Sequence, residues 1–131
     1  MKNRKTNKNK AKNRKLPRFL QPILWSYDIS KMNTEDDKDI IIEQILNYGA
    51  EEELKWLIKT YRDRDIRNVL SHPSRGNWFP DVLNYWLNIL NIKLDKDDYE
   101  LAIRDLCPSP KRRKLIWRLL SKRINASKKK I

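Results

Sequence analysis

Several residue types are scarce in this sequence, and each scarcity excludes a class of protein. There are only two glycines, too few for a glycine-rich phosphate-binding loop. The single cysteine, Cys107, allows no internal disulfide and excludes a multi-cysteine zinc site, which fits a reducing cytoplasm. Every apolar run is far shorter than a membrane span, and no apolar stretch follows the basic N-terminus closely enough to predict a signal peptide.

Catalytic residue patterns are equally scarce. The only histidine, His72, precedes a proline where a helix should end, and a structural role is the simpler explanation. Cys107 has no nearby histidine and no second cysteine to form a redox pair. The acidic run from Asp95 to Glu100 lacks the glycine and the closing glutamate of a calcium loop. We therefore expect no enzyme activity, no metal and no cofactor.

Acidic residues are absent from both ends of the chain, although the net charge is +13. Residues 1–15 hold eight Lys or Arg, and residues 111–131 hold ten. All 17 Asp and Glu lie between Asp28 and Asp105, which leaves 16–110 with a net charge of −5. The sequence thus describes a mildly acidic body with two basic arms, and any attraction to nucleic acid belongs to the arms.

Apolar residues recur with helical spacing along most of the body, and no strand-like alternation is present. Leu54, Leu57, Ile58 and Tyr61 share one helix face, and Leu83, Trp86, Leu87 and Leu90 share another. We predict an all-α fold, a compact bundle of about five helices with a helix-turn-helix-like centre. The predicted helices span 33–48, 50–61, 63–72, 79–91 and 95–106, followed by a basic amphipathic helix over 111–124.

Capping residues support these boundaries. Asn33 or Thr34, Asp63 and Asp95 are predicted N-caps, and Gly49 is predicted to follow a helix end at C′. Pro80 suits a first helical turn. The predicted domain organisation is a disordered basic arm over 1–15, a helical domain over 16–106, a linker over 107–110 and a basic helix with a fraying tail over 111–131.

Nucleic-acid binding is one functional hypothesis. The second helix of the predicted helix-turn-helix, 79–91, has no Lys or Arg, which argues against major-groove recognition. The arms are better candidates, above all seven residues: Lys111, Arg112, Arg113, Lys114, Arg118, Lys122 and Arg123. The alternatives are that the arms only solubilise the protein, that the last helix folds onto the acidic body, or that the Trp117 helix lies on an anionic membrane surface.

Protein–protein binding is the other hypothesis. Five Trp and five Tyr are many for so small a body, and Trp25, Trp78 and Trp117 are the ones we expect to be exposed. Asp36, Asp39 and Glu43 share a helix face, which is more typical of a solvated acidic surface than of a metal site. The predicted partner-binding residues are Trp25, Trp78, Asp36, Asp39 and Glu43.

From Leu16 to about Ile92 the chain resembles a family of small, largely uncharacterised prokaryotic proteins. The matching features are Leu16-Pro17, 24–28 (LWSYD), 41–46 (IIEQIL) with Tyr48-Gly49, 54–61 (LKWLIKTY) and Tyr85-Trp86. The chain departs from the family at Asn77-Trp78-Phe79-Pro80, where a Ser-Pro helix start is expected, and in its basic arms. Members are often encoded beside nucleotidyltransferase-like abortive-infection toxins. The resemblance therefore implies an antitoxin or accessory partner of such a toxin, with nucleic-acid binding through the arms as the alternative.

Overall fold

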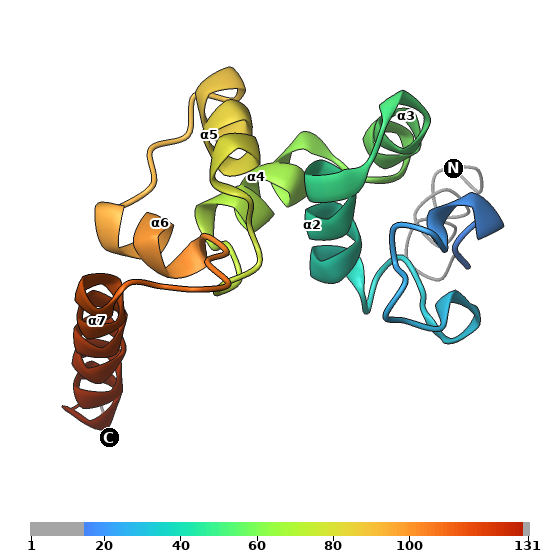
Figure 1. Ribbon diagram of the computed structural model, residues 1–131. Helices are drawn as coiled ribbons and strands as arrows, with labels where there is room; N and C mark the ends of the chain where they lie inside the picture. Colours follow the sequence, from blue (N-terminus) through green and yellow to red (C-terminus); the bar gives the residue numbers. More distant parts are fainter. Residues whose placement is uncertain (1–14, 130–131) are drawn as a thin grey trace. The chain divides into compact units, whose positions relative to one another are not determined.

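The computed structural model describes residues 15–129, and the side chains of residues 15–124 (Figure 1). This part of the chain consists of helices and turns, with two isolated bridges and no strand, so the predicted all-α class is confirmed. Contacts divide the chain into two compact units, Met1–Leu70 and Ser71–Ile131. The predicted disorder of the N-terminal arm falls on residues outside the described range, except at Lys15, which forms an antiparallel bridge with Asn33.

The first unit contains two short 3-10 helices and three α-helices. Their bounds are η1 (Arg18–Leu20), η2 (Ile29–Lys31), α2 (Lys38–Tyr48), α3 (Glu51–Thr60) and α4 (Asp63–Ser71), whose last residue begins the second unit. Helices α2 and α3 contact one another, and Gln44 Nε2 of α2 donates to the Ile23 carbonyl at 2.9 Å. The fully buried side chains are mostly aliphatic: Leu20, Leu24, Ile41, Ile42, Ile45, Leu57 and Leu70. The predicted central position of α2 is therefore confirmed.

Tyr61 closes the first unit with a buried polar contact. Its hydroxyl donates to the carbonyl of Thr34 at 2.8 Å, and both residues are buried. Burial raises the pKa of the Tyr61 phenol above its ordinary value, and the negative charges of Glu35 and Asp65 raise it further. The neutral, hydrogen-bonding phenol is thus the form that the fold stabilises.

Three predicted caps differ in detail from the structure. Asn33 Oδ1 accepts from the backbone N–H of Glu35 and Asp36, so it caps a turn that precedes α2. Asp63 is the first helical residue of α4 instead of its N-cap. Gly49 is the C-cap of α2 with an ordinary φ of −74°. Glycine is required there by space, because an added Cβ would lie 2.6 Å from the Ile45 carbonyl oxygen.

The second unit contains α5 (Pro80–Ile89), α6 (Lys96–Ala102) and α7 (Pro110–Lys129). Pro80 occupies the first turn of α5, as predicted. At the other end, Asn91 adopts a left-handed φ of 54°, and the Ile92 N–H donates to the Leu87 carbonyl at 2.9 Å. These are the features of a Schellman motif with asparagine in the usual glycine position. Asn84 Nδ2 of α5 donates to the Tyr99 hydroxyl of α6 at 3.1 Å.

Helix α6 ends at Ala102, four residues before its predicted end at Leu106, because a long-range pairing replaces its last turn. Trp78 and Ile103 form a parallel bridge. The Trp78 N–H donates to the Ala102 carbonyl at 3.0 Å, and the Arg104 N–H donates to the Trp78 carbonyl at 2.6 Å. Ile103 is consequently extended, with ψ of 143°. We call this pairing the Trp78 bridge.

Helix α7 runs to Lys129, five residues beyond the predicted end at Ile124, so most of the predicted fraying tail is helical. It contacts α6 within the second unit. Among the described residues, none of the helices combines the length and the apolar character needed to cross a bilayer.

Candidate nucleic-acid interface

Helix α7 begins at Pro110 because two residues there suit a helix start. Proline at the first helical position loses nothing through its missing N–H. Ser109 precedes it, and its Oγ accepts from the Arg112 N–H at 3.2 Å while its carbonyl accepts from the Arg113 N–H at 2.9 Å. The predicted linker over 107–110 is thus partly the cap of α7.

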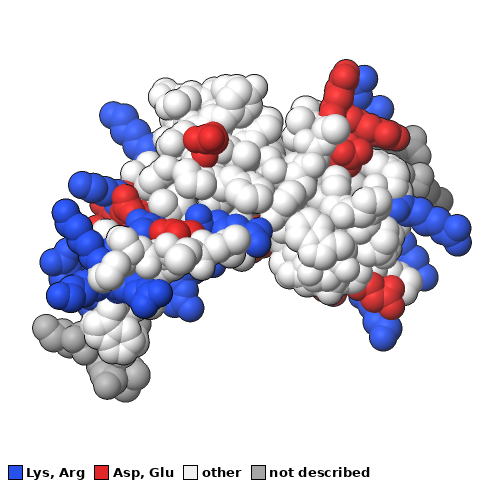
Figure 2. Space-filling view, in the orientation of Figure 1, with Lys and Arg blue, Asp and Glu red and all other residues white. Residues whose placement is uncertain are grey.

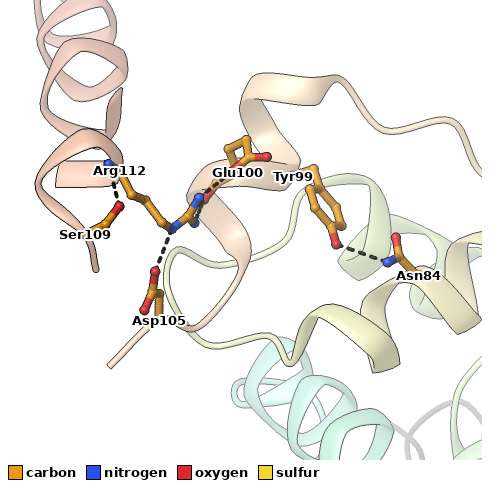
Figure 3. A network of polar contacts seen from close by, with 6 residues as sticks. All are labelled: Asn84, Tyr99, Glu100, Asp105, Ser109 and Arg112. Carbon is orange, nitrogen blue, oxygen red and sulfur yellow. Dashed lines mark hydrogen bonds and ion pairs between the residues drawn. The ribbon is translucent and has the colours of Figure 1, made fainter. Parts of the chain in front are cut away.

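Arg112 fastens α7 to the end of α6 (Figure 3). Its Nη1 forms an ion pair with Glu100 Oε2, and its Nη2 donates to the Glu100 carbonyl at 2.8 Å. Its Nε lies 2.9 Å from Asp105 Oδ2, as an ion pair without hydrogen-bond geometry. The Arg112 side chain is only 17% exposed. Arg112 therefore acts within the fold, and its role in nucleic-acid binding stays a prediction.

Arg123, eleven residues further along α7, forms an ion pair with Asp98 of α6. Leu119 is buried on the same side of the helix, and Ile116 and Leu120 are half-buried there. At about 100° per residue these side chains lie within one half of the helix circumference. We call this face of α7 the docked face. The predicted alternative in which the last helix packs on acidic residues of the body is confirmed, and those residues belong to α6.

Four other cations lie on the opposite face of α7. Lys111, Lys114, Arg118 and Lys122 follow one another at i, i+3, i+7 and i+11, and all four side chains are exposed. Within the described part of the chain none of them forms an ion pair. With a rise of 1.5 Å per residue, they span about 16 Å. We call these four residues the basic stripe; Figure 2 shows blue side chains gathered around α7.

A hollow opens beside the first turns of α7. Its volume is about 510 Å³, and Leu115 contributes its apolar part. The remaining lining residues are polar or cationic: Ser109, Lys111, Arg112, Lys114 and Arg118. Because Arg112 is neutralised by its carboxylate partners, the available positive charge comes from the stripe. Such a hollow suits an anionic group attached to an apolar or ring-shaped one.

Two large apolar side chains of α7 are also exposed. Trp117 is 71% exposed and Ile124 is 55% exposed. Arg113, the remaining predicted contact residue, is also exposed and lies one turn before Trp117. The structure thus leaves five of the seven predicted nucleic-acid residues exposed and without an ion pair among the described residues, together with the tryptophan that the sequence indicated.

Of the predicted partner-binding residues, some are exposed and others are buried. Trp25 is 57% exposed, and its ring meets Tyr48 edge to face at 4.7 Å. Asp36 and Asp39 are exposed, but Glu43 is only 7% exposed and therefore contributes little to an acidic surface. Trp78 is fully buried, so its predicted exposure is wrong. The bridge that Trp78 forms with Ile103 places its side chain inside the second unit.

Some exposed side chains were not anticipated. Ile58 was predicted on the buried face of α3 but is 70% exposed, and Tyr27 is 41% exposed. The helical spacing places Ile58 on the same face as Leu54 and Tyr61 and therefore does not indicate its exposure. His72 and Cys107 are exposed, and no group of three or more metal-ligating side chains occurs among the described residues.

Comparison with known proteins identifies one similarity, confined to the first unit. A family of unknown function (DUF6922) matches residues 19–70, which ends at the boundary between the two units. This confirms the resemblance to an uncharacterised family over a shorter span than the predicted 16–92. No curated protein and no solved structure matches the chain significantly. Helix α7 and its basic stripe lie outside the matched segment.

Proposed function

We propose that this protein is a non-enzymatic nucleic-acid-binding protein and that the basic stripe of α7 is its binding surface. The observation that carries the proposal is the separation of the helix into two faces. Arg112 and Arg123 are held by carboxylates of α6 and the neighbouring loop, whereas the four stripe residues are exposed without ion pairs among the described residues. Docked cations stabilise the fold, and undocked ones remain available to phosphates.

The size of the stripe suits a phosphate backbone. A length of about 16 Å corresponds to roughly five nucleotides of one strand at 3.4 Å per nucleotide along a duplex axis. Four phosphate contacts would contribute a slope of about −3.6 to a plot of log K against log salt for duplex DNA. Binding through the stripe would thus weaken about 150-fold between 50 and 200 mM salt.

The test is a titration of labelled DNA with the full-length protein over a salt series. The variant replaces all four stripe residues by glutamine, and it should reduce the magnitude of the salt slope by about 3 to 4. A matched control removes the same net charge from exposed cations of the first unit that form no ion pair with any described residue. The control substitutions are Arg18→Gln, Lys31→Gln, Lys59→Gln and Arg64→Gln.

Any contribution of the N-terminal arm is present in the wild type and in both variants, so the difference between them isolates α7. Equal slopes for the stripe variant and the control would refute binding through the stripe. Circular dichroism of both variants should match the wild type, because none of the substituted side chains is buried.

A second candidate function concerns the first unit: antitoxin or accessory partner of a nucleotidyltransferase-like toxin. The exposed Trp25 and Tyr27 within the family-matched segment favour a protein-binding surface there, since aromatic residues are common anchors of interfaces. Asp36 and Asp39 add exposed negative charge, which would complement a basic cleft that holds nucleotide or RNA.

Co-expression with the product of the adjacent gene tests this second function, with host growth and co-purification as the measurements. Trp25→Ala should weaken both rescue and co-purification if Trp25 is an anchor. Tyr85→Ala is the control, because Tyr85 is equally exposed, at 56%, but lies in the second unit. A neighbour that is toxic alone yet neither rescued nor co-purified would rule out this partnership.

A further inference from the structure

We propose that the ligand of α7 is single-stranded nucleic acid and that one of its bases stacks on the indole of Trp117. This inference rests on the proposed nucleic-acid function and names the form of nucleic acid. Its basis is an exposed aromatic ring on a helix that ion pairs hold in place. The neighbouring cations form no ion pair with any residue that the structure describes.

Trp117 is more exposed than its size would lead one to expect. Its side chain is 71% exposed, and it forms no ring–ring or cation–ring contact within the described residues. Every other tryptophan of the second unit is sheltered: Trp78 is buried, and Trp86 is half-buried beside Tyr85. The fold therefore leaves most of the Trp117 side chain accessible to a ligand.

Cations flank this ring along the helix. Arg113 lies four residues before Trp117 and Lys114 lies three residues before it, so both share its side of α7. Arg118 and Lys114 also line the hollow at the start of the helix. A strand whose phosphates meet Lys114 and Arg118 would thus pass the hollow on one side and Trp117 on the other.

The hollow adds a place for a second part of the strand. Its volume of about 510 Å³ falls in the range of small-ligand sites, and Leu115 offers an apolar surface between Lys111 and Arg118. A sugar or base resting against Leu115 would keep its phosphate near those two cations. Single-strand sites combine a positively charged groove along the backbone with aromatic side chains on which bases stack.

A duplex would gain much less from this surface. In a duplex the flat faces of the bases are covered by their neighbours, so Trp117 could contribute only at an end or through distortion. A membrane surface would need a continuous apolar face, but Trp117 and Ile124 are the only large apolar side chains exposed on the described part of α7. Charge and an isolated ring together favour a single strand.

The experiment compares full-length wild type, Trp117→Ala and Trp117→Phe by fluorescence anisotropy. The probes are a labelled oligothymidylate of about twelve nucleotides, within the range of known single-strand sites, and a duplex with a similar number of phosphates. Tyr85→Ala is the matched control, because Tyr85 is an exposed aromatic residue on α5, a helix without Lys or Arg. Vesicles of mixed neutral and anionic lipid are the third probe.

We expect Trp117→Ala to weaken binding to oligothymidylate between about 5-fold and 100-fold, while binding to the duplex changes less than twofold. Trp117→Phe should retain most of the affinity, and Tyr85→Ala all of it. An equal effect of Trp117→Ala on both nucleic acids, or no effect, overturns the stacking inference while leaving the proposed function standing. If the wild type binds neither nucleic acid, both the proposed function and the stacking inference are overturned. If Trp117 is needed only for binding to vesicles, the surface binds lipid, and neither nucleic-acid proposal holds.

Discussion

Removal of the Arg112 guanidinium should weaken the docking of α7 within the second unit. Arg112→Met keeps much of the aliphatic chain but loses the ion pairs with Glu100 and Asp105 and the hydrogen bond to the Glu100 carbonyl. Hydrogen bonds to charged groups each contribute about 1.5–3 kcal/mol when sheltered. The two carboxylates are 23% and 31% exposed, so water would solvate them after the change. We therefore expect a net loss of about 2 kcal/mol.

Hydrogen exchange of the α7 amides is the assay, because exchange reports local opening. A loss of about 2 kcal/mol corresponds to roughly 30-fold faster exchange over residues 113–124. The undocked helix would have little stability of its own, since most of the stability of helices in proteins comes from the packing of their apolar face. The exposed face would then lose its fixed geometry although none of its residues had changed.

Arg113→Met is the matched control for this prediction. It removes the same charge from the next residue of the same helix, but the Arg113 side chain is exposed and pairs with no carboxylate among the described residues. Its exchange rates should stay within about twofold of the wild type, as for an ordinary surface substitution. Equal protection of α7 in the two variants would refute the idea that Arg112 fastens the helix.

Two further predictions concern the first unit. Tyr61→Phe should lower the free energy of unfolding by about 1–2 kcal/mol in urea titrations at pH 7, because it removes the buried hydrogen bond from the Tyr61 hydroxyl to the Thr34 carbonyl. Folding raises the pKa of Tyr61 above the unfolded value of about 10, so the contribution of Tyr61 to stability is intact below pH 10 and is lost as the pH rises toward the folded-state pKa. The stability of the wild type should therefore fall more steeply above pH 10 than that of Tyr61→Phe. Gly49→Ala should cost about 1–3 kcal/mol by thermal unfolding, because its Cβ would meet the Ile45 carbonyl oxygen at 2.6 Å; an unchanged melting temperature would show that the backbone relaxes freely.

The helices could be predicted from the sequence because they follow from local spacing. Each predicted helix has a counterpart in α2 to α7, and Pro80 lies at the predicted first turn. The errors occur where residues distant in sequence meet. Helix α6 stops at Ala102 because Trp78 pairs with Ile103, and no local pattern indicates a pairing across 25 positions. The burial of Trp78 was missed for the same reason.

The candidate site was predictable in part. Nothing in the Lys111–Lys114 run distinguishes Arg112 from its neighbours. On charge alone, all seven cations are therefore equivalent candidates for nucleic-acid binding. Helical phase separates them, because Arg112, Leu119 and Arg123 fall on one face at i, i+7 and i+11. The carboxylates that hold Arg112 and Arg123 could not be assigned without the fold. Glu43 is a similar case: it lies in a helix that is apolar around much of its circumference, which favours burial over a solvated surface.

The Trp78 bridge also determines where the chain should tolerate changes in length. Between α5 and α6, Lys93 and Asp95 are exposed and follow the Schellman turn, so extra residues there would lengthen a closed loop at a cost of only about 0.6 kcal/mol per doubling. From Ile103 to Ser109 the situation is the opposite. An insertion there would change the spacing between Arg112 and its partner Glu100 on α6, and an insertion after Asp105 would also displace Asp105 relative to Arg112. Insertions and deletions in variants of this chain should therefore accumulate before α6 and be rare after it.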